Sequence, residues 1–125
     1  MRVLLVDDEK ELVEALAERL SLREIEADWA TTCKDALGML DTQEYDVALL
    51  DVKMPKLSGI ALKREMEKKA PHMKFIFLTG HGSEADFRAG AAEAGVEYYL
   101  VKPVGIDTLV EKMREVVGEG GDRHA

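Results

Sequence analysis

Residues 3–9 read Val3-Leu4-Leu5-Val6-Asp7-Asp8-Glu9, an uninterrupted apolar run that turns acidic within one residue. A short apolar run without alternation is typical of a parallel strand that is covered on both faces. Three later runs have the same character, at 47–50, 75–78 and 98–101. One more strand, the second in chain order, is predicted over 27–30, where polar and apolar residues alternate. This alternation indicates an edge strand with one wetter face.

Five amphipathic stretches alternate with these strands and predict helices. In the first stretch, large apolar residues recur at helical spacing, and the last stretch before the glycine-rich tail repeats the pattern. Asp8, followed three residues later by Glu11, predicts a capping box at the start of the first helix. The fourth predicted helix, about 83–94, is the weakest because Gly90 lies in its interior, where glycine costs about 1 kcal/mol relative to alanine.

The alternation of strands and helices predicts an α/β fold of the (βα)5 type, a doubly wound, five-stranded parallel sheet with right-handed crossovers. A chain of 125 residues, of which 46% are hydrophobic, suits one domain with a proper core. We expect this domain to cover residues 1–118. Residues 119–125 are glycine-rich and polar, which predicts a flexible tail or the start of a linker.

The formal net charge of −8 argues against direct binding to nucleic acid or to anionic membranes, because both would repel so acidic a domain. The single cysteine, Cys33, rules out an internal disulfide and fits a reducing compartment. The apolar run at the N-terminus is too short for a signal peptide or a membrane span. We therefore expect the chain to act in the cytoplasm.

Side chains capable of chemistry follow four of the five predicted strands. Asp7 and Asp8 follow the first strand, Asp51 the third, Thr79 the fourth and Lys102 the fifth. The carboxyl ends of parallel strands lie at one edge of a sheet, which is where open α/β sheets bind their ligands. Each residue alone has an ordinary explanation, as a helix cap, a turn former or a solvated lysine. Their coincidence at one edge favours a shared site.

The residue types at this edge point to phosphoryl transfer. Clustered carboxylates repel one another and raise each other's pKa unless a divalent cation lies between them. Oxygen ligands favour magnesium, which takes one or two carboxylates and leaves another free as a nucleophile. Lys102 would supply a second cation, and the Thr79 hydroxyl a hydrogen bond to the phosphoryl group. The expected product is an acyl phosphate on Asp51, which is hydrolysable and therefore suits a transient signal.

The motifs at these strand ends resemble those of the receiver domains of two-component response regulators. They read Val-Asp-Asp-Glu at 6–9, Leu-Asp-Val-Lys-Met-Pro at 50–55, Leu-Thr-Gly at 78–80 and Val-Lys-Pro at 101–103. The resemblance covers residues 2–118 and implies a flavodoxin-like fold of the chemotaxis-regulator type, with strand order 2-1-3-4-5. It also implies a signalling domain that catalyses only its own phosphorylation and dephosphorylation and is not otherwise an enzyme.

The resemblance further implies how the site residues divide their work. Asp51 would accept the phosphoryl group from a histidine kinase or a phosphotransfer protein. Asp8 and Asp51 would bind Mg²⁺ directly. The backbone carbonyl of Lys53 would be the third protein ligand, and Asp7 would act mostly through water.

The same resemblance implies how phosphorylation would be sensed. Thr79 and Lys102 would contact the phosphoryl group, and Tyr99 matches an aromatic switch that moves when Thr79 is drawn in. Lys53 and His81 occupy positions that tune the lifetime of the phosphoryl group. The weak fourth helix, the last strand and the last helix would then form a face for an output domain, an effector protein or a second copy of the chain.

Three other functions fit parts of the sequence. A degenerate receiver would bind partners without phosphorylation, but the intact acidic site argues against it. A small magnesium-dependent phosphatase would carry a second Asp two residues after its nucleophile, where this chain has Glu9 after Asp7 and Lys10 after Asp8. A glycine pattern at 80–85 suggests a dinucleotide binder, but that pattern follows the fourth strand and not the first.

Overall fold

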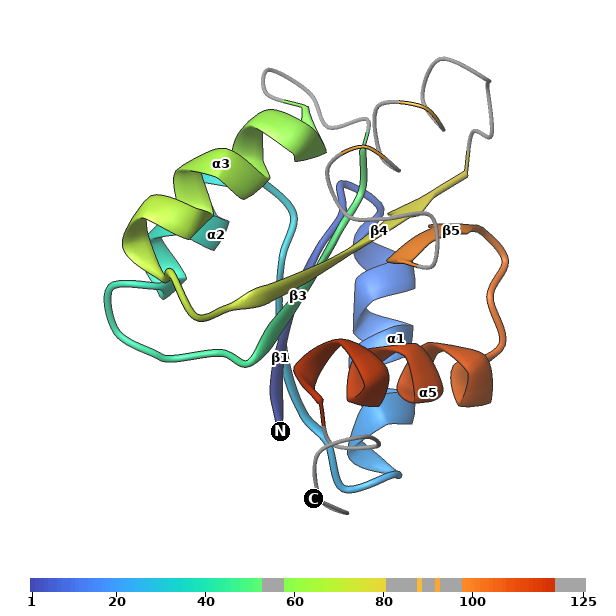
Figure 1. Cartoon of the computed structure of the whole chain (residues 1–125). Helices are drawn as coiled ribbons and strands as arrows, with labels where there is room; N and C mark the ends of the chain where they lie inside the picture. The colour runs from blue at the N-terminus through green and yellow to red at the C-terminus, as the bar shows by residue number, and fades with distance from the viewer. Residues whose placement is uncertain (53–57, 81–87, 89–91, 93–97, 119–125) are drawn as a thin grey trace.

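The computed structural model describes residues 1–52, 58–80, 88, 92 and 98–118 (Figure 1). Strands and helices alternate as predicted as far as residue 79, after which the next described element is again a strand. The predicted fourth helix lies almost wholly outside the described residues, and the predicted tail lies outside them entirely. The elements are β1 (Arg2–Val6), α1 (Lys10–Ser21), β2 (Glu26–Ala30), α2 (Cys33–Met39), β3 (Val47–Leu50), α3 (Gly59–Lys69), β4 (Lys74–Thr79), β5 (Tyr99–Val101) and α5 (Ile106–Val117).

The five strands form one parallel sheet in the order β2-β1-β3-β4-β5, which confirms the predicted fold class and strand order. The edge position of β2 agrees with its alternating sequence, because most of its residues are only partly buried. The inner strands β1 and β3 are apolar and almost wholly buried, as expected for strands covered on both faces. The apolar runs at 3–6, 47–50 and 75–78 therefore form the inner strands, whereas the run at 98–101 forms the second edge strand, β5.

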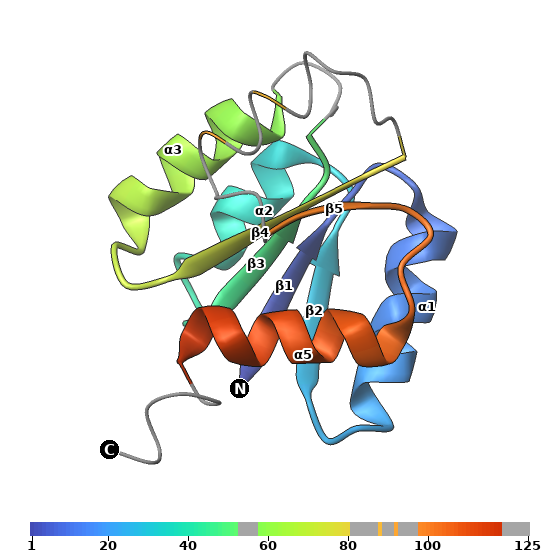
Figure 2. The same cartoon turned by 45° about the vertical axis from the view of Figure 1, so that its right-hand side comes forward.

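Helices cover both faces of the sheet. Figures 1 and 2 show α1 and α5 together on one face and α2 and α3 on the other. Alternate residues of each strand divide the core accordingly, because successive side chains of a strand point to opposite faces. Leu4 and Val6 pack with the α2 and α3 side, and Val3 and Leu5 pack with the α1 and α5 side. This two-sided packing fixes the strand ends that carry the site.

The start of α1 differs from the prediction. The N-cap residue is Glu9, which makes no side-chain capping hydrogen bond, so the predicted capping box of Asp8 and Glu11 is wrong. Asp8 instead lies with two other carboxylates at the edge of the sheet. By contrast, α2 and α3 do begin with side-chain caps, since the Thr32 and Ser58 hydroxyls accept backbone hydrogen bonds.

Several strand boundaries differ from the predicted ones by a single residue at one or both ends. The strands β1, β2 and β4 are longer than predicted, because polar residues at their ends still join the backbone ladder. The strand β5 begins at Tyr99, one residue later than predicted. Among the described residues, no helix combines the length and the apolar character that crossing a membrane requires.

Candidate functional site

Two neighbouring strands carry the acidic residues to the same edge of the sheet. Val6 and Leu50, the last residues of β1 and β3, are paired in register. The backbone ladder continues one residue further, because the Asp51 N–H donates to the Val6 carbonyl (3.0 Å) and the Asp7 N–H donates to the Ala30 carbonyl (3.3 Å). Backbone hydrogen bonds that extend the sheet therefore fix the positions of Asp7 and Asp51.

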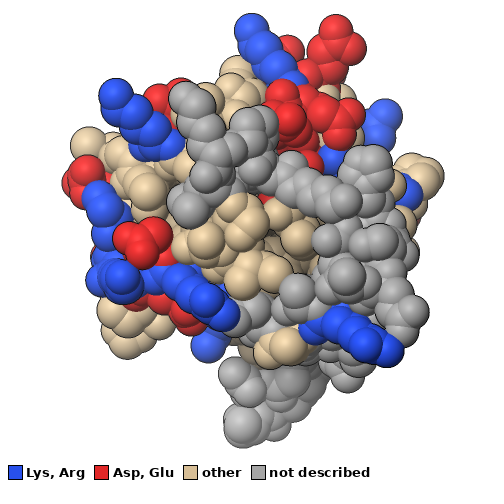
Figure 3. Space-filling model, turned by 90° about the horizontal axis from the view of Figure 1, so that it is seen from above, with Lys and Arg blue, Asp and Glu red and all other residues tan. Residues whose placement is uncertain are grey.

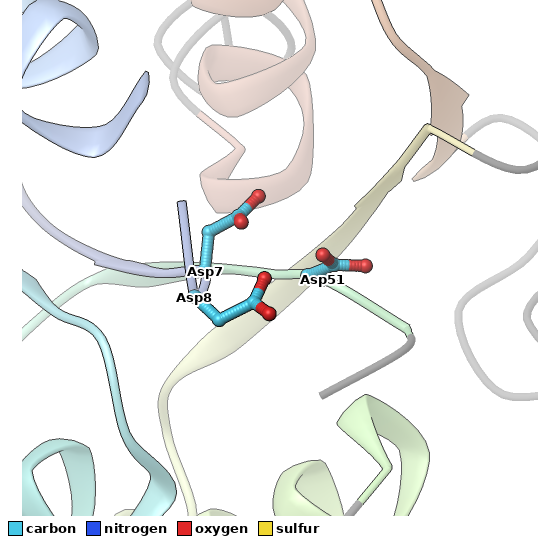
Figure 4. Close-up of side chains that lie close together, drawn as sticks. All are labelled: Asp7, Asp8 and Asp51. Carbon is cyan, nitrogen blue, oxygen red and sulfur yellow. The ribbon is translucent and has the colours of Figure 1, made fainter. Parts of the chain in front are cut away.

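The carboxylates of Asp7, Asp8 and Asp51 form one cluster, in which a ligand oxygen of each lies within 4.8 Å of the others (Figure 4). Asp7 and Asp51 are buried, with 4% and 7% of their surface exposed, whereas Asp8 is exposed. Seen from above, acidic side chains gather on one part of the face at which β1 and β3 end (Figure 3). Among the three carboxylates, Asp8 is thus the one exposed to solvent.

The electrostatics of Asp7 reflect this crowding. Burial raises the pKa of Asp7 above its usual value, and the negative charge of Asp51 acts in the same direction. Hydrogen bonds from Lys102 and from the Glu9 backbone N–H lower the pKa without cancelling the rise. Burial and the neighbouring Asp51 thus both disfavour the charged form of Asp7, and a divalent cation would stabilise that form.

Lys102, which follows the outer strand β5, extends to the acidic cluster. It follows β5 directly, and its backbone N–H donates to the Thr79 carbonyl (2.7 Å). Its Nζ atom lies 2.6 Å from Asp7 Oδ2, 2.7 Å from Glu9 Oε1 and 3.8 Å from Asp51 Oδ2. Burial acts to lower the pKa of Lys102, but the hydrogen bonds to Asp7 and Glu9 and the charges of Asp7 and Asp51 raise it overall. Lys102 is therefore a cation at neutral pH.

Thr79 and Tyr99 lie on neighbouring strands. Thr79 is the last residue of β4 and is fully buried. Tyr99 is the first residue of β5, pairs with Phe77 of β4, and has 4% of its surface exposed. Both predicted residues thus lie on the adjacent strands β4 and β5, and the Thr79 carbonyl accepts the backbone hydrogen bond of Lys102. Lys53 and His81, the two remaining predicted residues, lie outside the described residues.

Gly59 supports Asp51 in a way that sequence reasoning missed. Its N–H donates to the Val52 carbonyl (2.8 Å), so that the start of α3 packs against the backbone that follows β3. A Cβ atom at this position would overlap the Asp51 carbonyl oxygen. Glycine is common near the start of a helix and gives no specific signal in the sequence, so only the fold reveals this close approach.

The described donors of the cluster suit a hard divalent cation. All three are carboxylates, and oxygen ligands favour magnesium or calcium over zinc. Magnesium binds through one or two carboxylates and keeps several waters, which leaves room for a phosphoryl group. Asp8 is exposed and can accept an ion from solvent, whereas Asp7 and Asp51 lie at the base of the site.

Comparison with known proteins gives relatives that match most of this chain. It is 31% identical over 117 residues to the response regulator MprA of Mycobacterium avium, with 94% of this chain and 51% of that protein covered. It is 33% identical over 125 residues to the hydrogenase transcriptional regulatory protein HoxA of Cupriavidus necator, with 98% of this chain and 26% of that protein covered. The chain spans about half the length of MprA and about a quarter of HoxA.

Solved structures share the same architecture. A CheY-like response regulator receiver domain protein from Methanospirillum hungatei matches with a TM-score of 0.84 and 30% identity, over 98% of this chain and 97% of that one. The family model of the response regulator receiver domain matches residues 3–114. That match covers all five strands except the first residue of β1, together with the ends that carry Asp7, Asp51 and Lys102, and on this ground the chain belongs to the family of response regulator receiver domains.

Proposed function

We propose that this receiver domain takes a phosphoryl group onto Asp51 and uses the event as a signal. The observation that carries the proposal is the surroundings of Asp51, a buried carboxylate beside two others and 3.8 Å from a lysine ammonium. The donor would be a histidine kinase or a phosphotransfer protein, consistent with the two-component signalling of the family. The domain would catalyse its own phosphorylation and dephosphorylation and have no other enzymatic activity.

The chemistry needs little covalent help from the protein. A carboxylate oxygen of Asp51 attacks the phosphorus of a phosphohistidine, the phosphorus–nitrogen bond breaks, and the released imidazole nitrogen takes up a proton. The product is an acyl phosphate. Attack of water on its phosphorus later releases inorganic phosphate and restores the Asp51 carboxylate, which ends the signal.

We propose Mg²⁺ as the cofactor of this reaction, held by Asp8, Asp51 and the backbone carbonyl of Lys53, with Asp7 acting mostly through water. The clustered carboxylate oxygens support this assignment. When bound, the ion offsets the charge of the carboxylates and that of the transferred phosphoryl oxygens. Asp7 also orients Lys102, to which it is hydrogen-bonded at 2.6 Å.

Lys102 and Thr79 would bind the transferred group. The Lys102 ammonium is already close to Asp51, so that a short movement brings it to a phosphoryl oxygen. The Thr79 hydroxyl would donate a hydrogen bond to another phosphoryl oxygen. The backbone hydrogen bond from Lys102 to the Thr79 carbonyl keeps these two residues together. Lys53 and His81 would tune the lifetime of the phosphoryl group.

The signal would leave the site through β5. We propose that Thr79 moves toward phosphorylated Asp51 and that Tyr99 follows it. These movements would shift the equilibrium between two conformations of the last strand and its surroundings. The segment 83–94, β5 and α5 would present the face that partners recognise. An output domain, a separate effector or a second copy of this chain would bind there, with residues 119–125 as a tail or linker.

Intact mass spectrometry tests the proposal. We expect a single phosphoryl adduct after incubation with a small-molecule phosphodonor and Mg²⁺, and none without the ion or with Asp51→Asn. Asp35→Asn, an exposed change in α2, is the matched control and should label normally. If neither the small donor nor a histidine kinase gives an adduct, the chain acts instead as a phosphorylation-independent interaction module.

A further inference from the structure

We propose that Glu9 holds the ammonium group of Lys102 away from Asp51 in the unphosphorylated protein, and thereby slows the uptake of the phosphoryl group. This inference rests on the proposed function, because it concerns the rate of that reaction. It assigns a positioning role to a residue that lies outside the cluster of three carboxylates.

The distances around Lys102 carry the inference. Its Nζ atom is within hydrogen-bonding distance of Glu9 Oε1 (2.7 Å) and of Asp7 Oδ2 (2.6 Å). The distance to Asp51 Oδ2 is 3.8 Å, which is too long for a hydrogen bond. The ammonium group is therefore hydrogen-bonded to Asp7 and Glu9, and its contact with Asp51 is a longer ionic one.

The backbone of Glu9 is well placed to hold this contact. Glu9 is the N-cap residue of α1, and its N–H donates to Asp7 Oδ1 at 2.9 Å. Its carbonyl accepts from the backbone N–H groups of Leu12 and Val13. Its side chain is 62% exposed, so its reach to Lys102 is not forced by packing. The contact joins the loop after β1 to the loop after β5, across 93 positions of sequence.

Glu9 would oppose phosphorylation in two ways that act in the same direction. It competes with the incoming phosphoryl oxygens for the Lys102 ammonium group. Glu9 and Asp51 lie 2.7 Å and 3.8 Å from the same Lys102 Nζ atom, so the negative charge of Glu9 would also repel the anionic donor and the phosphorylated product. Glu9 is exposed and Lys102 keeps Asp7 as an ion-pair partner, so removing the charge of Glu9 should change the reaction much more than the fold.

The test compares Glu9→Gln with Glu11→Gln, a matched control that removes the same charge from an exposed position in the first turn of α1. The donor is acetyl phosphate at saturating Mg²⁺. The Asp51 carboxylate forms a bond to phosphorus, the bond from phosphorus to the acetate oxygen breaks, and acetate leaves. We expect Glu9→Gln to acquire the adduct about 3- to 10-fold faster than the parent protein, and Glu11→Gln to stay within about twofold of it.

A second readout needs neither the metal nor the donor. In metal-free protein, NMR relaxation of the Lys102 ¹³Cε atom reports how firmly the ammonium end is held. We expect larger motion in Glu9→Gln, unchanged motion in Glu11→Gln, and an intermediate result in Glu9→Asp, whose shorter side chain reaches less far. A change in the fold would alter the whole spectrum and not this side chain alone.

The outcomes separate this inference from the proposed function. Equal rates and equal Lys102 relaxation in the parent and in Glu9→Gln would overturn the role of Glu9, and an adduct on the parent would still support phosphorylation of Asp51. If the parent itself takes no phosphoryl group from acetyl phosphate or from a histidine kinase, the proposed function falls. The relaxation data then still decide whether Glu9 holds Lys102.

Discussion

At the scale of single residues, Gly59 shows how a missing side chain can serve a reactive one. The first turn of α3 lies so close to the end of β3 that a methyl group on Gly59 would overlap the carbonyl oxygen of Asp51. A larger residue would push the backbone of Asp51 away from Asp7 and Asp8. The geometry of the acidic cluster therefore depends on a position that has no reactive group of its own.

Gly59→Ala should accordingly damage the site more than the helix. We expect the free energy of unfolding to fall by about 1–3 kcal/mol through overpacking, and the rate of phosphorylation to fall by about 10- to 100-fold through misplacement of Asp51. Urea unfolding and the rate of adduct formation measure the two effects. The control is Gly38→Ala in α2, where a Cβ atom meets nothing within 4 Å. That variant should label normally and gain up to about 1 kcal/mol of stability.

At the scale of the elements, the sequence predicted strands better than helix ends. Apolar runs such as 47–50 have few alternatives in an α/β sheet, because the two covered faces leave no room for polar residues. The alternation near Trp29 placed β2 at an edge without further information. The remaining strand order depends on pairing between distant segments, which periodicity does not encode, and it came from the resemblance to receiver domains.

The wrong prediction at α1 has the same physical origin. A capping box is a local rule that weighs only the residues next to the helix. Asp8 lies instead with Asp7 and Asp51, and Asp51 is contributed by a strand more than forty positions away. Similarly, the position of the site residues at the carboxyl ends of the strands was predictable from the sequence. The Glu9–Lys102 contact and the close approach of Gly59 to Asp51 could be found only in the folded structure.

The strand β5 should respond to phosphorylation more than the rest of the sheet. It has three residues and pairs with β4, whereas β1 and β3 each lie between two strands. We expect the backbone N–H groups of residues 99–102 to change their hydrogen-exchange protection when Asp51 is phosphorylated, and those of β1 to keep theirs. Hydrogen exchange on the phosphorylated and free protein measures this, with Asp51→Asn as the control. Identical protection in the two forms would contradict a switch through β5.

At the scale of the whole molecule, the acidic site lowers the stability of the metal-free fold through repulsion between like charges. Three carboxylates within 4.8 Å of one another repel in the absence of a cation, and the chain as a whole carries a net charge of −8. Asp8, the exposed member of the cluster, is the one whose charge can be removed with the least disturbance of packing. The folded state therefore contains a cost that a bound divalent ion would offset.

Asp8→Asn should be at least as stable as the parent protein without Mg²⁺ and less stable than the parent with Mg²⁺. In metal-free protein we expect the variant to melt at the same temperature as the parent or higher, because one repelling charge is gone. With Mg²⁺ at about 100 times its dissociation constant, the parent should gain about 2.7 kcal/mol and the variant much less. Thermal unfolding with EDTA and with Mg²⁺ measures both, and Asp35→Asn should follow the parent. An equal gain in parent and Asp8→Asn would exclude Asp8 as a ligand.

The pairing of β5 with a single neighbouring strand has a further consequence for signalling. Lys102 follows this strand directly, so a partner that bound the proposed face and shifted β5 would also shift the Lys102 ammonium group. Coupling between two binding sites is reciprocal. If phosphorylation strengthens the binding of a partner, that partner strengthens the hold on the phosphoryl group by the same factor. The amount of partner in the cell would then help to set how much of this protein carries the signal.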